Sequence, residues 1–180
     1  MSDMKKYVLT ALTLGLIAAS GALLIAGTNM ITKDTIAANE KKSINNGIAT
    51  IYGDVSDTEE ISLAEGKEYT YTTTCYKVID SNAQVSGYAF RTDGSNNYGK
   101  ISLIIGFNNE KAYKGLSVIT NEQSFASTLK KGYIDVIKNG DKTVDDTDVS
   151  CGATYGAKLV RAMVKDAEQA VKDLIGGNNG

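Results

Sequence analysis

One threonine hydroxyl is the group best placed for chemistry in this chain. Residues 148–154 read Asp-Val-Ser-Cys-Gly-Ala-Thr, and the pattern that follows predicts an amphipathic helix from Tyr155. The Thr154 hydroxyl then stands at a helix N-terminus, where free N–H groups and a partial positive charge favour a phosphate. Gly152 and Ala153 leave room for another molecule to approach the backbone. The alternative is an ordinary loop in which Thr154 is the N-cap of the helix.

The segments that must position this hydroxyl include four predicted strands. β-Branched and aromatic residues predict strands over 69–79, 85–92, 99–107 and 112–120, with turn clusters between them. Short turns between consecutive strands predict antiparallel hairpins. The segment 55–67 is acidic and is expected to form turns. The soluble part is therefore expected to be α+β, with a twisted antiparallel sheet packed against helices.

Helical periodicity appears before and after the predicted sheet. Residues 39–53 are expected to form a helix that continues from the membrane anchor. After the sheet, apolar residues at i, i+4, i+8 and i+11 predict one helix face. Its members are Phe125, Leu129, Tyr133 and Val136. The last helix has a similar stripe, formed by Leu159, Val160, Met163, Val164, Ala167, Val171 and Leu174. Both stripes are expected to form core.

The N-terminal segment has the composition of a membrane anchor. Tyr7–Thr32 contains no charged residue, and about 20 apolar residues suffice for a helix to cross a bilayer. Lys5 and Lys6 precede it, which places the N-terminus in the cytoplasm and the rest outside. The expected organisation is a cytoplasmic tail and transmembrane anchor over 1–32, a juxtamembrane helix and connector over 33–66, and an extracytoplasmic domain over 67–180. A cleaved signal peptide is the alternative.

Composition excludes several classes of site. The chain has no His, which rules out a His-based triad and His ligation of haem or zinc. Two Cys are too few for a four-Cys iron–sulfur site. Nineteen basic against 21 acidic residues, net −2, leave no electrostatic footprint for nucleic acid. The two thiols, Cys75 and Cys151, either form a disulfide or are separate and buried.

The run at 148–154 resembles the acceptor motif Asp-x-x-Ser/Thr-Gly-Ala-Thr of proteins flavinylated on Thr. Asp148, Gly152, Ala153 and Thr154 match it, whereas Cys151 stands where Ser or Thr is usual. The resemblance implies that a flavin transferase splits FAD and leaves FMN on the Thr154 oxygen as a phosphoester. Lys158 or Arg161, farther along the helix, would either reach that phosphate or lie on a solvated face.

The order of the predicted strands and helices resembles the FMN-binding domain of the Rnf and Nqr membrane complexes. Glu122 matches the Glu of that family's Glu-Thr-Pro-Gly-Leu-Gly element, and residues 123–127 depart from the rest of it. One N-terminal membrane helix in a chain of 180 residues is similar to the G subunit of Rnf. Glu122 either caps the following helix or, as the resemblance implies, lines the flavin pocket. Tyr155 either packs on the flavin or has a core or surface role.

The resemblance implies an electron carrier without its own substrate site. FMN on Thr154 would relay electrons within a membrane complex that passes them between ferredoxin and NAD and moves Na⁺ or H⁺. Its partners would be the other membrane subunits and, during maturation, the flavin transferase. Two alternatives stay open. One is a free-standing flavinylated surface protein that carries electrons, and the other is a flavin-free anchored interaction module.

Overall fold

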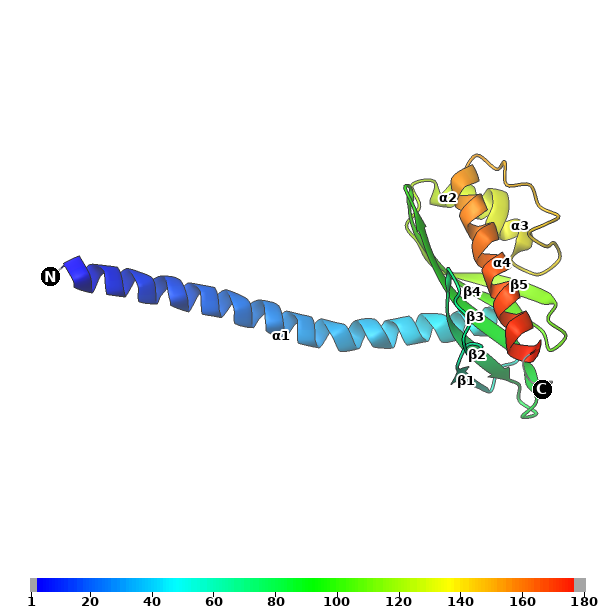
Figure 1. Cartoon of the computed structure of the whole chain (residues 1–180), viewed down its shortest axis with the longest axis horizontal. Coiled ribbons are helices and arrows are strands. Elements are labelled where there is room, and N and C mark those ends of the chain that lie inside the picture. Colours follow the sequence, from blue (N-terminus) through cyan, green and yellow to red (C-terminus); the bar gives the residue numbers. More distant parts are fainter. Residues whose placement is uncertain (1–2, 177–180) are drawn as a thin grey trace. The chain divides into compact units, whose positions relative to one another are not determined.

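The structure is a computed structural model that describes residues 3–176. The chain divides into two compact units, Met1–Lys42 and Ser43–Gly180. The second unit contains a five-stranded sheet and the helices packed on it, so the predicted α+β class is confirmed. Figure 1 shows these elements along the chain.

The first helix, α1, spans Asp3–Tyr52. Within it, Met4–Thr28 is the one stretch of the described chain long and apolar enough to cross a membrane. Three of its hydroxyl side chains, Thr10, Thr13 and Ser20, donate hydrogen bonds to the carbonyl four residues earlier, at 2.8–2.9 Å. Such bonds satisfy polar groups where water is absent. The helix runs on to Tyr52, which confirms the helix predicted at 39–53.

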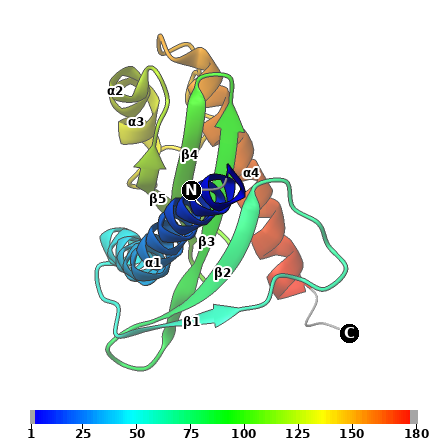
Figure 2. The same cartoon turned by 90° about the vertical axis from the view of Figure 1, so that its left-hand side faces the viewer.

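The sheet is an antiparallel meander in chain order, as Figure 2 shows. Its strands are β1 (Asp57–Ile61), β2 (Thr72–Ile79), β3 (Val85–Asn96), β4 (Gly99–Phe107) and β5 (Tyr113–Asn121). The strands β2 to β5 were predicted with every end within four residues, and β4 has the predicted bounds.

The prediction of turns throughout 55–67 is wrong, because Asp57–Ile61 forms an edge strand. Asp57 pairs with Ile79 and Ile61 pairs with Cys75, both on β2. Acidic residues are rare in strands by propensity, but charged side chains are common on exposed edges. The strand forms because it pairs with β2, and its own amino-acid composition does not predict it.

The turn predicted after residue 92 also lies elsewhere. Asp93 pairs with Ser102 and Asn96 pairs with Gly99, so β3 continues four residues farther than expected. The connection to β4 is then only residues 97–98. This long hairpin carries Tyr98 at its tip, which becomes important for the site.

Alternate residues of β4 enter two different cores, as the two-residue period of a strand requires. Leu103 and Ile105 belong to the main core beneath the C-terminal helices. Ile104 belongs to a smaller core on the other face, with Ile48 and Tyr52 from the last turns of α1. The Tyr52 hydroxyl lies 2.8–2.9 Å from two main-chain carbonyls of the sheet.

The remaining helices lie on the face of the main core (Figure 1). They are α2 (Ala126–Leu129), the π-helical turn η1 (Lys130–Ile134), α3 (Asp135–Ile137) and α4 (Thr154–Gly176). The predicted stripe of α4 is confirmed: its members are buried, except Leu174, which is half-buried. The glycine at position 94 of β3 lets α4 approach closely, because a Cβ there would lie 2.9 Å from the Met163 sulfur.

The predicted single face from Phe125 to Val136 is wrong in part. Leu129 and Tyr133 are fully buried, whereas Phe125 and Val136 are exposed. The Asp135 N–H donates to the carbonyl five residues earlier, which is a π-helical bond. This wider turn moves Val136, which follows it, off the predicted face, whereas Phe125 precedes it and is the N-cap of α2, outside the regular helix.

Candidate functional site

Thr154 is the first residue of α4. Its hydroxyl forms no hydrogen bond with any residue within 3–176. The Ala157 N–H donates to the Ala153 carbonyl at 3.0 Å, so Ala153 occupies the cap position. The alternative prediction that Thr154 is the N-cap is therefore wrong. Its side chain is half-buried and available for chemistry.

A cavity of about 230 Å³ adjoins this hydroxyl. Four of the predicted site residues line it: Gly152, Ala153, Thr154 and Tyr155. The other lining residues come from the hairpin tip, the segment after β5, α2 and α4. They are Tyr98, Gln123, Phe125, Leu129 and Gly156. Ligand pockets commonly measure about 300–1,000 Å³, so this cavity would hold part of a ligand as large as a flavin.

Three exposed aromatic side chains surround the cavity. The Tyr98 and Tyr155 rings are stacked, with centroids 5.4 Å apart and an interplanar angle of 26°. Phe125 lies 6.3 Å from Tyr98. Their exposed fractions are 38%, 64% and 54% for Tyr98, Tyr155 and Phe125, respectively. Exposed apolar side chains gathered in one place are typical of a binding surface, and these offer ring faces to a planar ligand.

The hairpin tip is held over the site by the segment that follows β5. The Ser124 N–H donates to the Tyr98 carbonyl at 2.8 Å, and the Glu122 N–H donates to the Lys100 carbonyl at 2.9 Å. The two backbones approach closely at Gly99, where a Cβ would lie 2.2 Å from the Glu122 carbonyl oxygen. Only glycine fits there, so Gly99 determines where Tyr98 stands.

Gln123 is the one lining residue with a buried side-chain amide. It is 6% exposed, and its Nε2 donates to the Gly99 carbonyl. Its Oε1 lies 3.4 Å from the position that a Cβ would take on Gly156, and it accepts no hydrogen bond from residues 3–176. The amide therefore presents a fixed acceptor beside Thr154. Sequence reasoning missed Gln123, although it stands where the chain departs from the family pattern after Glu122.

Glu122 and Asp148 do not line the cavity. The Glu122 side chain is exposed, and its backbone ties β4 to the next segment. The Asp148 carboxylate accepts a hydrogen bond from the Ser150 N–H at 3.0 Å, which holds the pKa of Asp148 below its usual range. Asp148 thus shapes the loop before Thr154. A contact of either residue with a flavin stays a prediction.

Glycines let the loop before Thr154 pack closely on η1 and let the start of α4 pack closely on α2. A Cβ on Gly132 would lie 2.8 Å from the Cys151 Cβ, and one on Gly156 would lie 2.8 Å from a Leu129 methyl carbon. Gly152 has a φ of +79°, which side chains other than glycine rarely adopt. The conformation and the close packing of the loop therefore depend on these glycines.

The two cysteines are separate thiols, and the alternative of a disulfide is wrong. Cys75 is fully buried on β2, and burial raises the pKa of its thiol to about 12. Cys151 is half-buried in the loop before Thr154. The cysteine at position 151 therefore does not tether the loop to the sheet.

The two basic residues considered for the phosphate differ in position. Arg161 donates from Nη2 to the Thr147 carbonyl, so its guanidinium serves the loop. Lys158 is exposed, and it forms no ion pair with any residue that the structure describes. Residues four apart on a helix are neighbours, so Lys158 lies on the same side of α4 as Thr154.

The comparisons bear on the N-terminal part of the chain. The family described as the RnfG N-terminal region matches residues 1–51. The comparison with curated proteins gave no match. The matched residues contain the predicted anchor and nearly all of α1.

Proposed function

We propose that this chain, an RnfG-type subunit of the Rnf complex, carries electrons through FMN joined to the Thr154 oxygen by a phosphoester. The flavin would supply the redox chemistry, and the protein would supply its position and electrostatic surroundings. The observation that carries the proposal is the free Thr154 hydroxyl beside a cavity rimmed by three exposed aromatic rings.

Attachment requires a transferase and FAD. The Thr154 oxygen would form a bond to the phosphorus of the FMN half, the P–O–P bond would break, and AMP would leave with the bridging oxygen. The hydroxyl proton would be lost in the same exchange. Gly152 and Ala153 leave the backbone accessible to the phosphate, and the start of α4 favours its negative charge.

The remaining lining residues would orient the flavin. Tyr98, Phe125 and Tyr155 offer ring faces for stacking, and the Gln123 Oε1 offers an acceptor for a ligand N–H or O–H group. A cavity of about 230 Å³ accommodates only part of the cofactor, so the rest would lie on the exposed rings. That exposure suits a carrier, which must pass electrons to another protein.

The complex supplies the partners. As an Rnf subunit, the chain has other Rnf components as partners, and its apolar N-terminal helix anchors it in the membrane. We further propose that Lys5 and Lys6 keep the N-terminus in the cytoplasm and that the sheet domain lies outside it. Electron transfer through the chain would then contribute to the coupling of redox chemistry to ion movement.

Thr154→Val tests the attachment, because it keeps the β-branched shape and removes the oxygen. We expect wild-type protein, coexpressed with a flavin transferase, to be heavier than its sequence mass by one FMN less one water. It should stay yellow after denaturation. The Val variant should fold and carry no covalent flavin, and Thr154→Ser should load in part.

Ser150→Ala is the matched control, since Ser150 is the nearest other hydroxyl in the loop. It should load like the wild type. Equal covalent flavin in wild type and Thr154→Val would move the attachment elsewhere. No flavin in either protein would leave the anchored interaction module as the function.

A further inference from the structure

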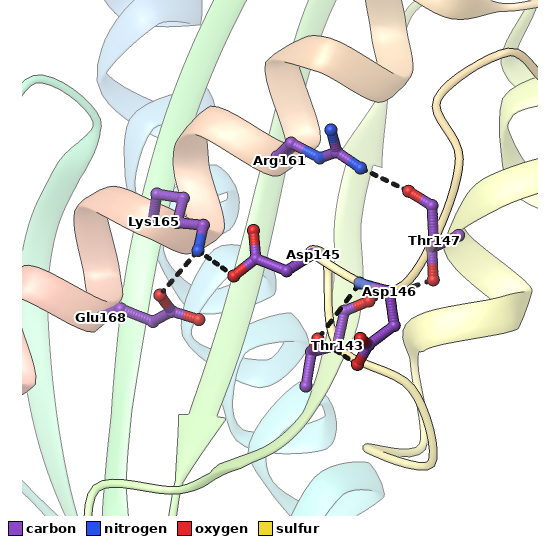
Figure 3. Close-up of polar contacts among 7 residues, drawn as sticks. All are labelled: Thr143, Asp145, Asp146, Thr147, Arg161, Lys165 and Glu168. Carbon is purple, nitrogen blue, oxygen red and sulfur yellow. Dashed lines mark hydrogen bonds and ion pairs between the residues drawn. The ribbon is translucent and has the colours of Figure 1, made fainter.

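The loop that leads to Thr154 is fastened to α4 by a polar network outside the cavity. We call this network the loop clasp. On the loop it comprises Thr143, Asp145, Asp146 and Thr147, and on α4 it comprises Arg161, Lys165 and Glu168 (Figure 3). The two basic residues lie four positions apart, so they project from neighbouring turns of one helix face. Each binds a different residue of the loop.

Arg161 is the interior member of the clasp. In Figure 3 its guanidinium points to the Thr147 carbonyl, to which Nη2 donates. Its Nε is buried without a hydrogen-bond partner, and it forms no ion pair within residues 3–176. The Tyr133 hydroxyl is also buried; burial raises its pKa, and the nearby Arg161 guanidinium opposes that rise. The guanidinium attracts the Asp145 and Asp148 carboxylates of the loop without forming an ion pair, and its hydrogen bond goes to the loop backbone, so both its charge and its geometry hold the loop.

The loop end of this contact is itself held in place. The Thr147 side chain is buried, and its hydroxyl donates to the Thr143 carbonyl at 3.0 Å. The Thr143 hydroxyl in turn donates to the Asp146 carboxylate at 2.7 Å. Arg161 therefore binds a turn that is already held by its own hydrogen bonds. Thr147 lies seven residues before Thr154, and Arg161 lies seven residues after it. Their hydrogen bond therefore joins the two ends of the segment that has the proposed attachment residue at its centre.

Lys165 forms the outer part of the clasp. Its ammonium group pairs with Asp145 of the loop and lies 3.6 Å from Glu168 of its own helix. Both Lys165 and Asp145 are well exposed, and exposed ion pairs contribute little to stability. Lys165 is thus a suitable control for Arg161, because it is also a basic residue of α4 that binds the same loop.

We propose that Arg161 is a positioning residue that holds the loop in the conformation on which a flavin transferase acts. This inference rests on the proposed function of Thr154. Arg161 acts through the Thr147 carbonyl and forms no hydrogen bond with the Thr154 hydroxyl within residues 3–176. Without it, only a fraction of the molecules would present the hydroxyl in the competent shape, and apparent affinity falls by that fraction.

The test measures flavin transfer onto the full-length chain in detergent, with product followed by intact mass. We expect Arg161→Met to raise the KM for the acceptor protein about tenfold with kcat unchanged. Arg161→Lys retains a donor for the carbonyl and should recover part of the loss. Lys165→Met should stay within about twofold of the wild type. An Arg161→Met variant with the wild-type KM would overturn the role of Arg161.

Hydrogen exchange separates positioning from general destabilisation. In Arg161→Met the backbone amides of residues 143–153 should exchange faster, while those of β4 keep their protection. Faster exchange throughout the sheet would assign the effect to stability and overturn the proposal. Wild-type protein that takes up no FMN on Thr154 would overturn the proposed function itself, which is a different outcome from normal loading with an unaffected Arg161 variant.

Discussion

Besides its apolar packing on the sheet, α4 is joined to the start of β2 by the Asp166 carboxylate, and Asp166→Asn tests this contact. Asp166 accepts hydrogen bonds from the backbone N–H groups of Thr70, Tyr71 and Thr72 at 2.8–3.0 Å, and from the Thr72 hydroxyl at 2.8 Å. Burial alone would raise the pKa of Asp166, but these bonds outweigh it and lower the pKa. The contact joins the helix that begins at Thr154 to the start of β2.

The magnitude follows from the number and type of bonds. Hydrogen bonds to a charged group contribute about 1.5–3 kcal/mol each, and neutral ones about 0.5–1.5 kcal/mol. Asn has one acceptor oxygen, and its NH₂ would face backbone N–H groups. Because Asp166 is only half-buried, solvent reduces the difference. We expect Asp166→Asn to lower the free energy of unfolding by about 2 kcal/mol at pH 7, from a typical total of about 5–15 kcal/mol.

The pH dependence of the unfolding free energy is a second test of the same contact. A carboxyl whose pKa is lower in the folded state stabilises the fold above its unfolded pKa, which is about 3.9 for Asp. That contribution is lost as the pH falls through the folded pKa. The difference in stability between wild type and Asp166→Asn should therefore be largest at neutral pH and should shrink below about pH 4.

Urea unfolding, followed by circular dichroism at pH 7, 5 and 3.5, measures both effects. Asp135→Asn is the matched control, since Asp135 forms an exposed ion pair with Lys138 three residues along the chain. It should change the unfolding free energy by less than about 0.5 kcal/mol. Equal midpoints for wild type and Asp166→Asn at pH 7 would refute the reasoning, as would a gap that persists unchanged at pH 3.5.

Three further predictions concern the site, the thiols and the topology. Tyr98→Ala should load FMN but raise its fluorescence, because a stacking ring is removed; fluorescence equal to the wild type would contradict the stacking. Iodoacetamide should label Cys151 in the native protein and Cys75 only after unfolding without reductant, because burial raises the pKa of Cys75 to about 12; two unlabelled cysteines after unfolding would indicate a disulfide. Protease added outside intact cells should digest the sheet domain and leave a membrane fragment; protection until the membrane is opened would reverse the orientation.

The strands that could be predicted are those whose signal is local. The apolar run over Gly99–Phe107 identifies β4 without reference to any partner. The edge strand Asp57–Ile61 has no such signal, since its acidic residues become a strand only by pairing with β2. Pairing also extends β3 through Asp93, a residue that in isolation favours a turn.

The site divides in the same way. Gly152, Ala153, Thr154 and Tyr155 are contiguous, so a motif could identify them together before any fold was known. Tyr98 and Gln123 lie far from them in the chain. The close approach of two backbones at Gly99 brings these residues to the cavity, and neither composition nor periodicity indicates that approach.

The number of residues in the π-helical turn Lys130–Ile134 determines how the residues before it are oriented relative to the core. A π-helical turn is an α-helical turn that has accepted one more residue, and each residue of an α-helix turns the chain by about 100°. Deletion of one residue there would restore the regular period and rotate the preceding segment relative to the core. Phe125 and Leu129 both precede the turn and would rotate together, so Phe125 would leave the cavity rim and Leu129 would leave the core. The extra residue of the π-helical turn thus fixes the rotation at which Leu129 fills the core while Phe125 borders the cavity.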